Sequence, residues 1–236
     1  MQIKNEFQQG ELHLKPGQLN LGYLKSFLNY PAARELPEYV QTFLNSSILP
    51  QLAATPIHYQ FRLLPISSAS EKDHSIKLSA GTVKTTFQGP VIYTLLKDCT
   101  NCIVFLINLS GMITDDPLHG FLTYSSFNSI LQSALDQFRK EIIKAMGIDE
   151  SFLTRRFAPG YCGWPLEEQS KILNLLNPRT MAVRLTSGLM LDPTHSLTGV
   201  YGLRRNTQQS ENIPCYTCTS ATCSVHLDFL NLKSCE

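Results

Sequence analysis

The chain has 236 residues, of which 43% are hydrophobic and 17% charged, and its formal net charge at pH 7 is +1. A chain of this size and composition can bury a full core as one domain with an appendage. Its near-zero net charge gives no electrostatic reason to expect nucleic acid or an anionic membrane as a partner. No apolar run approaches the about 20 residues of a membrane span, and the first residues lack the apolar core of a signal peptide. The expected location is therefore the cytoplasm.

The N-terminal part predicts helices followed by a β-hairpin. Helices are predicted at residues 20–28 and 36–52, where apolar positions recur at helical spacing between prolines. Residues 57–64 and 76–84 show the apolar alternation of paired strands. The hydrophilic residues 67–74 between them predict an exposed loop.

The middle of the chain predicts one long helix as its main packing element. A short helix at 90–96 and a strand at 102–109 come first, and the unbroken apolar run of that strand indicates burial on both faces. After a turn at residues 110–111, a helix is predicted over 123–146. The apolar positions on its broad face are Phe127, Ile130, Leu131, Ala134, Leu135, Phe138, Ile142 and Ile143.

Residues 165–201 predict a helix and short strands. A helix is expected to start at Pro165, because acidic residues follow in its first turn and apolar residues recur up to Leu176. Residues 181–186 and 189–191 predict strands, and a turn at 192–195 leads into a return strand.

These elements predict an α+β fold with a curved mixed or antiparallel sheet and helices. The domain is expected to cover residues 1–206, and a cysteine-rich tail to cover residues 207–236.

The stretch around Arg156-Phe-Ala158-Pro159-Gly160-Tyr161 has the features of a ligand-binding turn. Pro159 fixes φ, and Gly160 permits a backbone conformation that other residues avoid. Arg156 can hold a carboxylate bidentately, the backbone of Ala158 to Gly160 can reach an adenine edge, and the ring of Tyr161 can lie against a second ring or a sulfonium cation. An arginine beside such a turn also occurs for structural reasons alone.

The stretch resembles the Arg-x-x-x-Gly-Tyr signature of the activation (reactivation) domain of cobalamin-dependent methionine synthase. The residues that continue the resemblance, in order, are Leu185-Thr186 with Met190, Pro193, and Ser196-Leu197-Thr198-Gly199 with Tyr201. The resemblance implies a methionine synthase activation domain-like fold. It also implies S-adenosylmethionine binding through Arg156, Ala158, Pro159, Gly160 and Tyr161.

The family also places a carboxylate from the long helix near the sulfonium of the ligand, where an anion offsets a fixed positive charge. Asp136 and Glu141 are the candidates here. Glu141 is preferred, because the family's helix carries its glutamate towards its C-terminal half. A solvated helix face is the alternative interpretation of both acids.

The resemblance implies a component of a methyltransferase system more than an autonomous enzyme. The expected role is to support reductive methylation of cob(II)alamin on a separate cobalamin-dependent methionine synthase, so the expected partners are its cobalamin-binding module and an electron donor. One alternative is an adenosylmethionine-binding or metal or iron-sulfur accessory protein for another corrinoid methyltransferase. The chain departs from the family at Cys162-Gly163-Trp164. Trp164 is interpreted as a rim or core anchor, or as a contact for a docked cobalamin domain.

Seven cysteines, an odd number in short spacings, favour reduced thiols or metal ligands over a disulfide scaffold. The tail residues with metal-ligand spacing are Cys215, Cys218, Cys223 and His226, with Cys235 as the alternative to His226. Such a set suits zinc, and three of the cysteines suit an iron-sulfur cluster. A redox-labile or inert tail is the alternative. A second pair, Cys99 and Cys102, is interpreted as structural because it leads into a buried strand.

Overall fold

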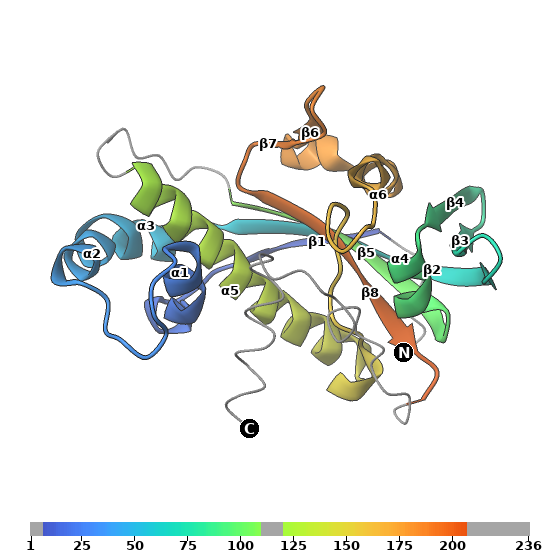
Figure 1. The fold of residues 1–236 in the computed structure, drawn as a ribbon, viewed down its shortest axis with the longest axis horizontal. Coiled ribbons are helices and arrows are strands. Elements are labelled where there is room, and N and C mark those ends of the chain that lie inside the picture. Colours follow the sequence, from blue (N-terminus) through green and yellow to red (C-terminus); the bar gives the residue numbers. More distant parts are fainter. Residues whose placement is uncertain (1–6, 110–119, 207–236) are drawn as a thin grey trace.

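The computed structural model describes residues 7–109 and 120–206. Its centre is an antiparallel sheet in the order β4-β3-β2-β5-β8, with β1 also paired to β2 (Figure 1). The strands are β1 (Phe7–Leu12), β2 (Ile57–Ser70), β3 (Ser75–Ala80), β4 (Val83–Gln88), β5 (Cys99–Leu109) and β8 (Ser196–Arg204). The predicted turn at 110–111 and the predicted tail at 207–236 lie outside the described residues.

Strand β2 is longer than its sequence predicted. Its first half pairs with β1 and its second half pairs with β3, with a register shift between Ile66 and Ser68. The hydrophilic segment predicted as a loop therefore continues the strand as far as Ser70, and residues 71–74 alone form the turn. Polar residues can continue an antiparallel strand where one face meets solvent. The predicted strand 76–84 divides at Gly81, whose φ of +60° makes the turn between β3 and β4.

Strand β5 separates two hydrophobic clusters, which explains its unbroken apolar sequence. Alternate residues of a strand point to opposite faces. Ile103, Phe105 and Ile107 belong to one cluster, whereas Val104 and Leu106 belong to the other. Both faces are thus covered, as the apolar run predicted.

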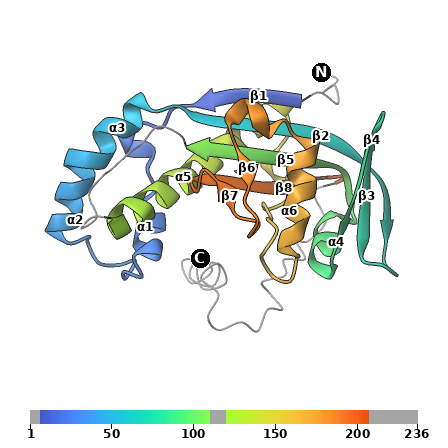
Figure 2. The same cartoon turned by 90° about the horizontal axis from the view of Figure 1, so that it is seen from above.

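One face is covered by the long helix α5 and the N-terminal helices (Figures 1 and 2). These are α1 (Leu21–Phe27), α2 (Glu38–Phe43), a π-helical segment η2 (Leu44–Ile48), α3 (Leu49–Ala54) and α5 (Gly120–Met146), preceded by the 3-10 turn η1 (Pro16–Gln18). The single helix predicted over 36–52 is divided by the π-helical segment. The long helix was predicted correctly.

Small polar residues of α5 set the position of α1. The Asn20 N–H donates to Ser133 Oγ at 3.0 Å, and Ser129 Oγ donates to the Asn20 carbonyl at 3.2 Å. Asn20 also caps α1, since its side chain accepts from the Gly22 N–H at 2.9 Å. The start of α1 is therefore attached to α5 by hydrogen bonds, which places Tyr23 beside that helix.

The other face is covered by α4 (Pro90–Leu96), η5 (Leu166–Glu168), α6 (Gln169–Leu175) and η6 (Pro178–Met181), with a small hairpin of β6 (Arg184–Leu185) and β7 (Leu191–Asp192). Two segments predicted as longer strands thus form strands of two residues each. The return strand β8 pairs with β5 instead of with β7. A further 3-10 turn, η4 (Glu150–Phe152), follows α5.

The predicted α+β class with helices around an antiparallel sheet is confirmed. Within the described ranges, none of the helices combines the length and apolar character that a membrane crossing requires.

Candidate functional site

The segment before the Arg156 turn runs along the edge of β8. It forms isolated bridges from Leu153 to Leu203 and from Phe157 to Val200. The Phe157 N–H donates to the Val200 carbonyl at 2.9 Å, and the Val200 N–H donates back at 2.8 Å. Neighbouring residues of an extended segment point to opposite sides. Phe157 accordingly stacks on Trp164 on the α6 side, and Arg156 reaches Gln132 of α5.

The turn itself depends on three residues with positive φ. These are Gly160 at +90°, Cys162 at +46° and Gly163 at +79°. The Gly160 N–H donates to the Trp164 carbonyl at 2.8 Å, and the Trp164 N–H donates to the Tyr161 carbonyl at 2.9 Å. The expectation that Gly160 adopts a conformation unfavourable for other residues is confirmed.

Trp164 anchors this turn to the hydrophobic core. Its side chain is 1% exposed and lies between Phe157, at 5.9 Å between ring centroids, and Phe87, at 5.4 Å. Its indole Nε1 is buried without a hydrogen-bond partner among the described residues. The core-anchor interpretation of Trp164 is confirmed, and the suggested contact with a docked domain is wrong for this conformation because the ring is not accessible.

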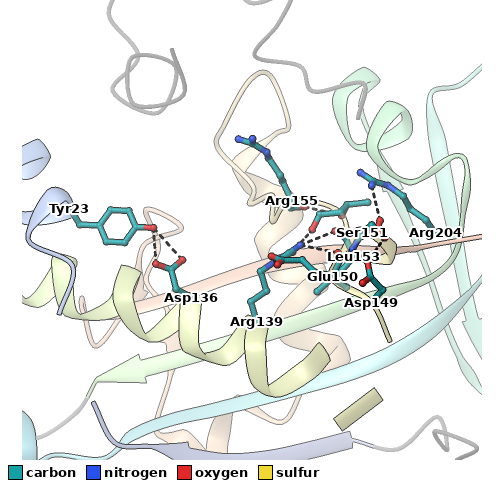
Figure 3. Close-up of polar contacts among 10 residues, drawn as sticks. Tyr23, Asp136, Arg139, Asp149, Glu150, Ser151, Leu153, Arg155 and Arg204 are labelled. Atoms are coloured by element: carbon teal, nitrogen blue, oxygen red, sulfur yellow. Dashed lines mark hydrogen bonds and ion pairs between the residues drawn. The ribbon is translucent and has the colours of Figure 1, made fainter. Parts of the chain in front are cut away.

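Arg156 lies in a group of polar side chains from three parts of the chain. Its guanidinium donates to Gln132 Oε1. Tyr23 Oη donates to both carboxylate oxygens of Asp136, at 3.2 and 3.0 Å, and Figure 3 shows the two side chains pointing toward one another from α1 and α5. Arg156 acts electrostatically on Tyr23, Asp136 and the buried Tyr201.

The pKa values of this group reflect partial exclusion of water. Desolvation is the main cause that raises the pKa of Tyr23 to about 12, and the Asp136 charge adds to it. Desolvation also raises the pKa of Asp136, while the Tyr23 hydrogen bond and Arg156 act in the lowering direction. Burial raises the pKa of Tyr201 to about 12. Both phenols therefore stay protonated near neutral pH and can act as donors.

The structure places Glu141 away from this group. Five residues separate it from Asp136, which rotates it by about 140° around the helix axis. Its carboxylate accepts from Gln137 Nε2 at 3.1 Å, and it contributes, after desolvation, to raising the pKa of Tyr59. Asp136 is thus the carboxylate of α5 that the structure brings together with Arg156. A glutamine one helical turn before it, at Gln132, shares its face and was detectable from spacing.

Arg139 connects the same helix face to the segment that leads into Arg156 (Figure 3). Its guanidinium donates to the carbonyls of Thr154 at 2.7 Å and Leu153 at 3.0 Å, and pairs with the Glu150 carboxylate at 3.1 Å. It also lies over the ring of Tyr201, 5.7 Å from the centroid. Sequence reasoning missed Arg139 and Tyr23, because nothing in the local pattern distinguishes them.

The other residues predicted to bind the ligand lie around the turn. Ala158 is half-buried, Pro159 is buried, and Gly160 and Tyr161 are exposed. The Tyr161 residue is 47% exposed, so its ring is accessible. Among the described residues, the structure records no hydrogen-bond partner for the N–H or C=O of Ala158. The turn therefore offers one arginine, the N–H and C=O of Ala158, and one aromatic face.

The cysteines comprise a buried pair, the half-buried Cys162 of the turn, and those of the tail. Cys99 and Cys102 are buried, and burial is the main cause that raises the pKa of Cys99 to about 12 and raises that of Cys102. This agrees with their structural interpretation. The predicted metal ligands Cys215, Cys218, Cys223 and His226 lie outside the described residues, and the part of the chain that is described holds no group of three or more side chains suited to a metal ion.

Comparison with known proteins gives a likeness of fold. No family model and no curated protein matches the chain. Among solved structures, the crystal structure of the MetH reactivation domain bound to AdoHcy is similar, with a TM-score of 0.60 and 12% identity, covering 90% of this chain and 82% of that chain. At this identity the likeness shows a shared fold.

Proposed function

We propose that this protein binds S-adenosylmethionine at the Arg156 turn and supports reductive methylation of cob(II)alamin on a separate cobalamin-dependent methionine synthase. One observation carries the proposal. A chain with the fold of a reactivation domain that was solved with AdoHcy also carries the turn Arg156 to Tyr161, held along the sheet edge with Gly160 at a positive φ.

The residues present fit the charges and shape of this ligand. Arg156 is exposed and matches a carboxylate, and the peptide group of Ala158 matches the polar edge of an adenine. The accessible ring of Tyr161 suits stacking or contact with a cation. Asp136 replaces Glu141 as the proposed acid, because it shares the space around Arg156.

The chemistry then asks this chain to position more than to react. One electron from a separate donor would reduce the partner's cob(II)alamin to cob(I)alamin. The S–CH3 bond of adenosylmethionine would then break as the methyl group passes to the cobalt, giving methylcobalamin and leaving S-adenosylhomocysteine. Arg156 and the turn fix the donor's orientation, and the Asp136 carboxylate, held by Tyr23, faces the sulfonium. Holding reactants in line and away from water is a major source of rate acceleration.

The test is calorimetric titration with S-adenosylmethionine. Wild-type protein is expected to bind one equivalent, and Arg156→Ala to lose at least about tenfold in affinity, because a charge-assisted bidentate contact is removed. The matched control is Arg184→Ala, which removes the same charge from an exposed pair with Asp192 at 2.8 Å. Equal binding by wild type and Arg156→Ala would refute the site.

The partner is tested separately with a cob(II)alamin reactivation assay. Methylation that requires a cobalamin-dependent methionine synthase, the chain and an electron donor supports the proposed role. Methylation of another corrinoid protein in its place would support the alternative of an accessory protein for a different methyltransferase. Metal and sulfide analysis of anaerobically purified protein tests the zinc or iron-sulfur assignment of the tail.

A further inference from the structure

Arg156 and Asp136 carry opposite charges in the same site, yet they are not paired with each other. Arg156 acts electrostatically on Asp136, but no ion pair joins the two side chains within the described residues. Each has a neutral hydrogen-bond partner instead. The Arg156 guanidinium donates to Gln132, and the Asp136 carboxylate accepts from the Tyr23 hydroxyl. Opposite charges attract one another, and these two neutral partners hold the side chains apart.

We infer that Tyr23 is a positioning residue that keeps the Asp136 carboxylate from pairing with Arg156, so that the site accepts a small ligand bearing both a carboxylate and a cationic group. This inference rests on the proposed function and deepens it. The hydroxyl of Tyr23 donates to both oxygens of Asp136, at 3.2 and 3.0 Å, which fixes the plane of the carboxylate. A ligand carboxylate can then take Arg156, and its ammonium or sulfonium can face Asp136.

The position of Tyr23 is itself defined by the fold. Its helix is attached to α5 through Asn20, which bonds Ser129 and Ser133. The phenol keeps its proton near neutral pH, since desolvation raises its pKa to about 12. It therefore remains a donor wherever Asp136 is ionised. The other charged groups that act on Asp136 are Arg156, Lys140 and Arg139.

Removing the hydroxyl tests the inference with little change in packing. In Tyr23→Phe the aromatic ring stays, but the Asp136 carboxylate loses its hydrogen bond. The carboxylate is then expected to pair with the Arg156 guanidinium, which the ligand carboxylate needs. Affinity for S-adenosylmethionine is expected to fall about tenfold, the size expected for one hydrogen bond to a charged group. Because the effect acts through Asp136, it should shrink to less than about twofold in an Asp136→Asn background, where no charge remains to pair.

The experiment compares wild type, Tyr23→Phe, Asp136→Asn and the double variant by calorimetry, with thermal unfolding as a check on folding. A purely structural role of Tyr23 would weaken binding equally in both backgrounds, and that result would overturn the inference. Wild-type affinity in Tyr23→Phe, beside lost binding in Arg156→Ala, would also overturn it while leaving the proposed function intact.

A ligand-free measurement separates the two proposals. The crystal structure of the Tyr23→Phe variant is expected to show the Asp136 carboxylate in direct contact with the Arg156 guanidinium. This contact would support the positioning role even if wild-type protein bound no adenosylmethionine, a result that would overturn the proposed function alone. A carboxylate unmoved from its wild-type place would overturn the positioning role.

Discussion

Gly199 leaves no room for a side chain at the point where β8 meets both the core and the Arg156 segment. A Cβ built on Gly199 would lie 2.8 Å from Phe105 Cζ and 2.8 Å from the main-chain oxygen of Phe157. Phe105 cannot move away easily, because it is 1% exposed and its ring packs against Phe138 at 5.5 Å and Tyr201 at 5.3 Å. Gly199→Ala therefore has to push apart either the aromatic core or the bridge between Phe157 and Val200.

The expected cost follows from these two contacts. Overpacking a well-filled core by one methyl costs about 1–3 kcal/mol. Weakening the two hydrogen bonds between Phe157 and Val200 adds about 1 kcal/mol. Replacing glycine by alanine also lowers the conformational entropy of the unfolded chain, which stabilises the folded protein by about 0.4–1 kcal/mol. We therefore expect Gly199→Ala to lower the free energy of unfolding by about 1–3.5 kcal/mol. It should also weaken the proposed adenosylmethionine binding, because Arg156 directly precedes the displaced residue.

Urea denaturation measures the free energy of unfolding, and calorimetry measures the affinity. Gly17→Ala is the matched control, because a Cβ at Gly17 would have no heavy atom within 4 Å, and its stability should stay within about 0.5 kcal/mol of wild type or rise slightly. A Gly199→Ala protein as stable as wild type would refute the packing argument. A destabilised protein with unchanged affinity would show instead that the pairing of Phe157 with β8 does not position Arg156.

Three further predictions concern stability, thiol reactivity and pH. Arg139→Met should lower the free energy of unfolding by about 2–3 kcal/mol, since it removes two part-buried hydrogen bonds from a charged donor; a denaturation midpoint equal to that of wild type would contradict this. In native protein at about pH 8, alkylation followed by peptide mass spectrometry should modify the half-buried Cys162 well before Cys99 and Cys102, whose pKa values are raised by burial, and equal rates at all three would be the opposing result. Burial lowers the pKa of His195 from 6.5, so the unfolded chain binds a proton that the folded protein does not, and its contribution makes stability fall as pH drops through about 6.5 toward the lowered value. Denaturation between about pH 7 and pH 5 should show a smaller loss in His195→Phe than in wild type, and an identical slope would refute the assignment.

Local patterns were sufficient to predict the elements that build the core. The apolar run of β5 and the apolar face of α5 each report burial through their own periodicity. The Gly160 turn was equally local, because a proline and a glycine specify its backbone without reference to distant residues. Where the structure differs from these predictions, contacts with residues distant in the sequence are the cause. Polar residues at the end of β2 stay in the strand because β3 pairs with them.

The charged part of the site could not be predicted in this way. Tyr23 and Asp136 are 113 residues apart in the sequence, and they meet because serines of α5 let α1 approach. Position along the helix favoured Glu141, but the choice between two acids on one helix depends on which face its neighbours cover. A separation of five residues turns Glu141 by about 140° away from Asp136, toward Tyr59 and Gln137.

The turn is specified locally, whereas the charged group beside it depends on distant residues, so the two can change independently. The turn from Arg156 to Tyr161 requires a positive φ at Gly160, so a substitution at this one position would strain its backbone directly. The Asp136 carboxylate, in contrast, is held by the phenol of Tyr23 on α1. That helix is attached to α5 through Asn20. A change in the N-terminal helices can therefore alter the charges around Arg156, and with them the proposed ligand contacts, while the turn itself stays intact. The identity of residue 23, more than that of the turn, should distinguish related chains that bind a cationic sulfonium from those that do not.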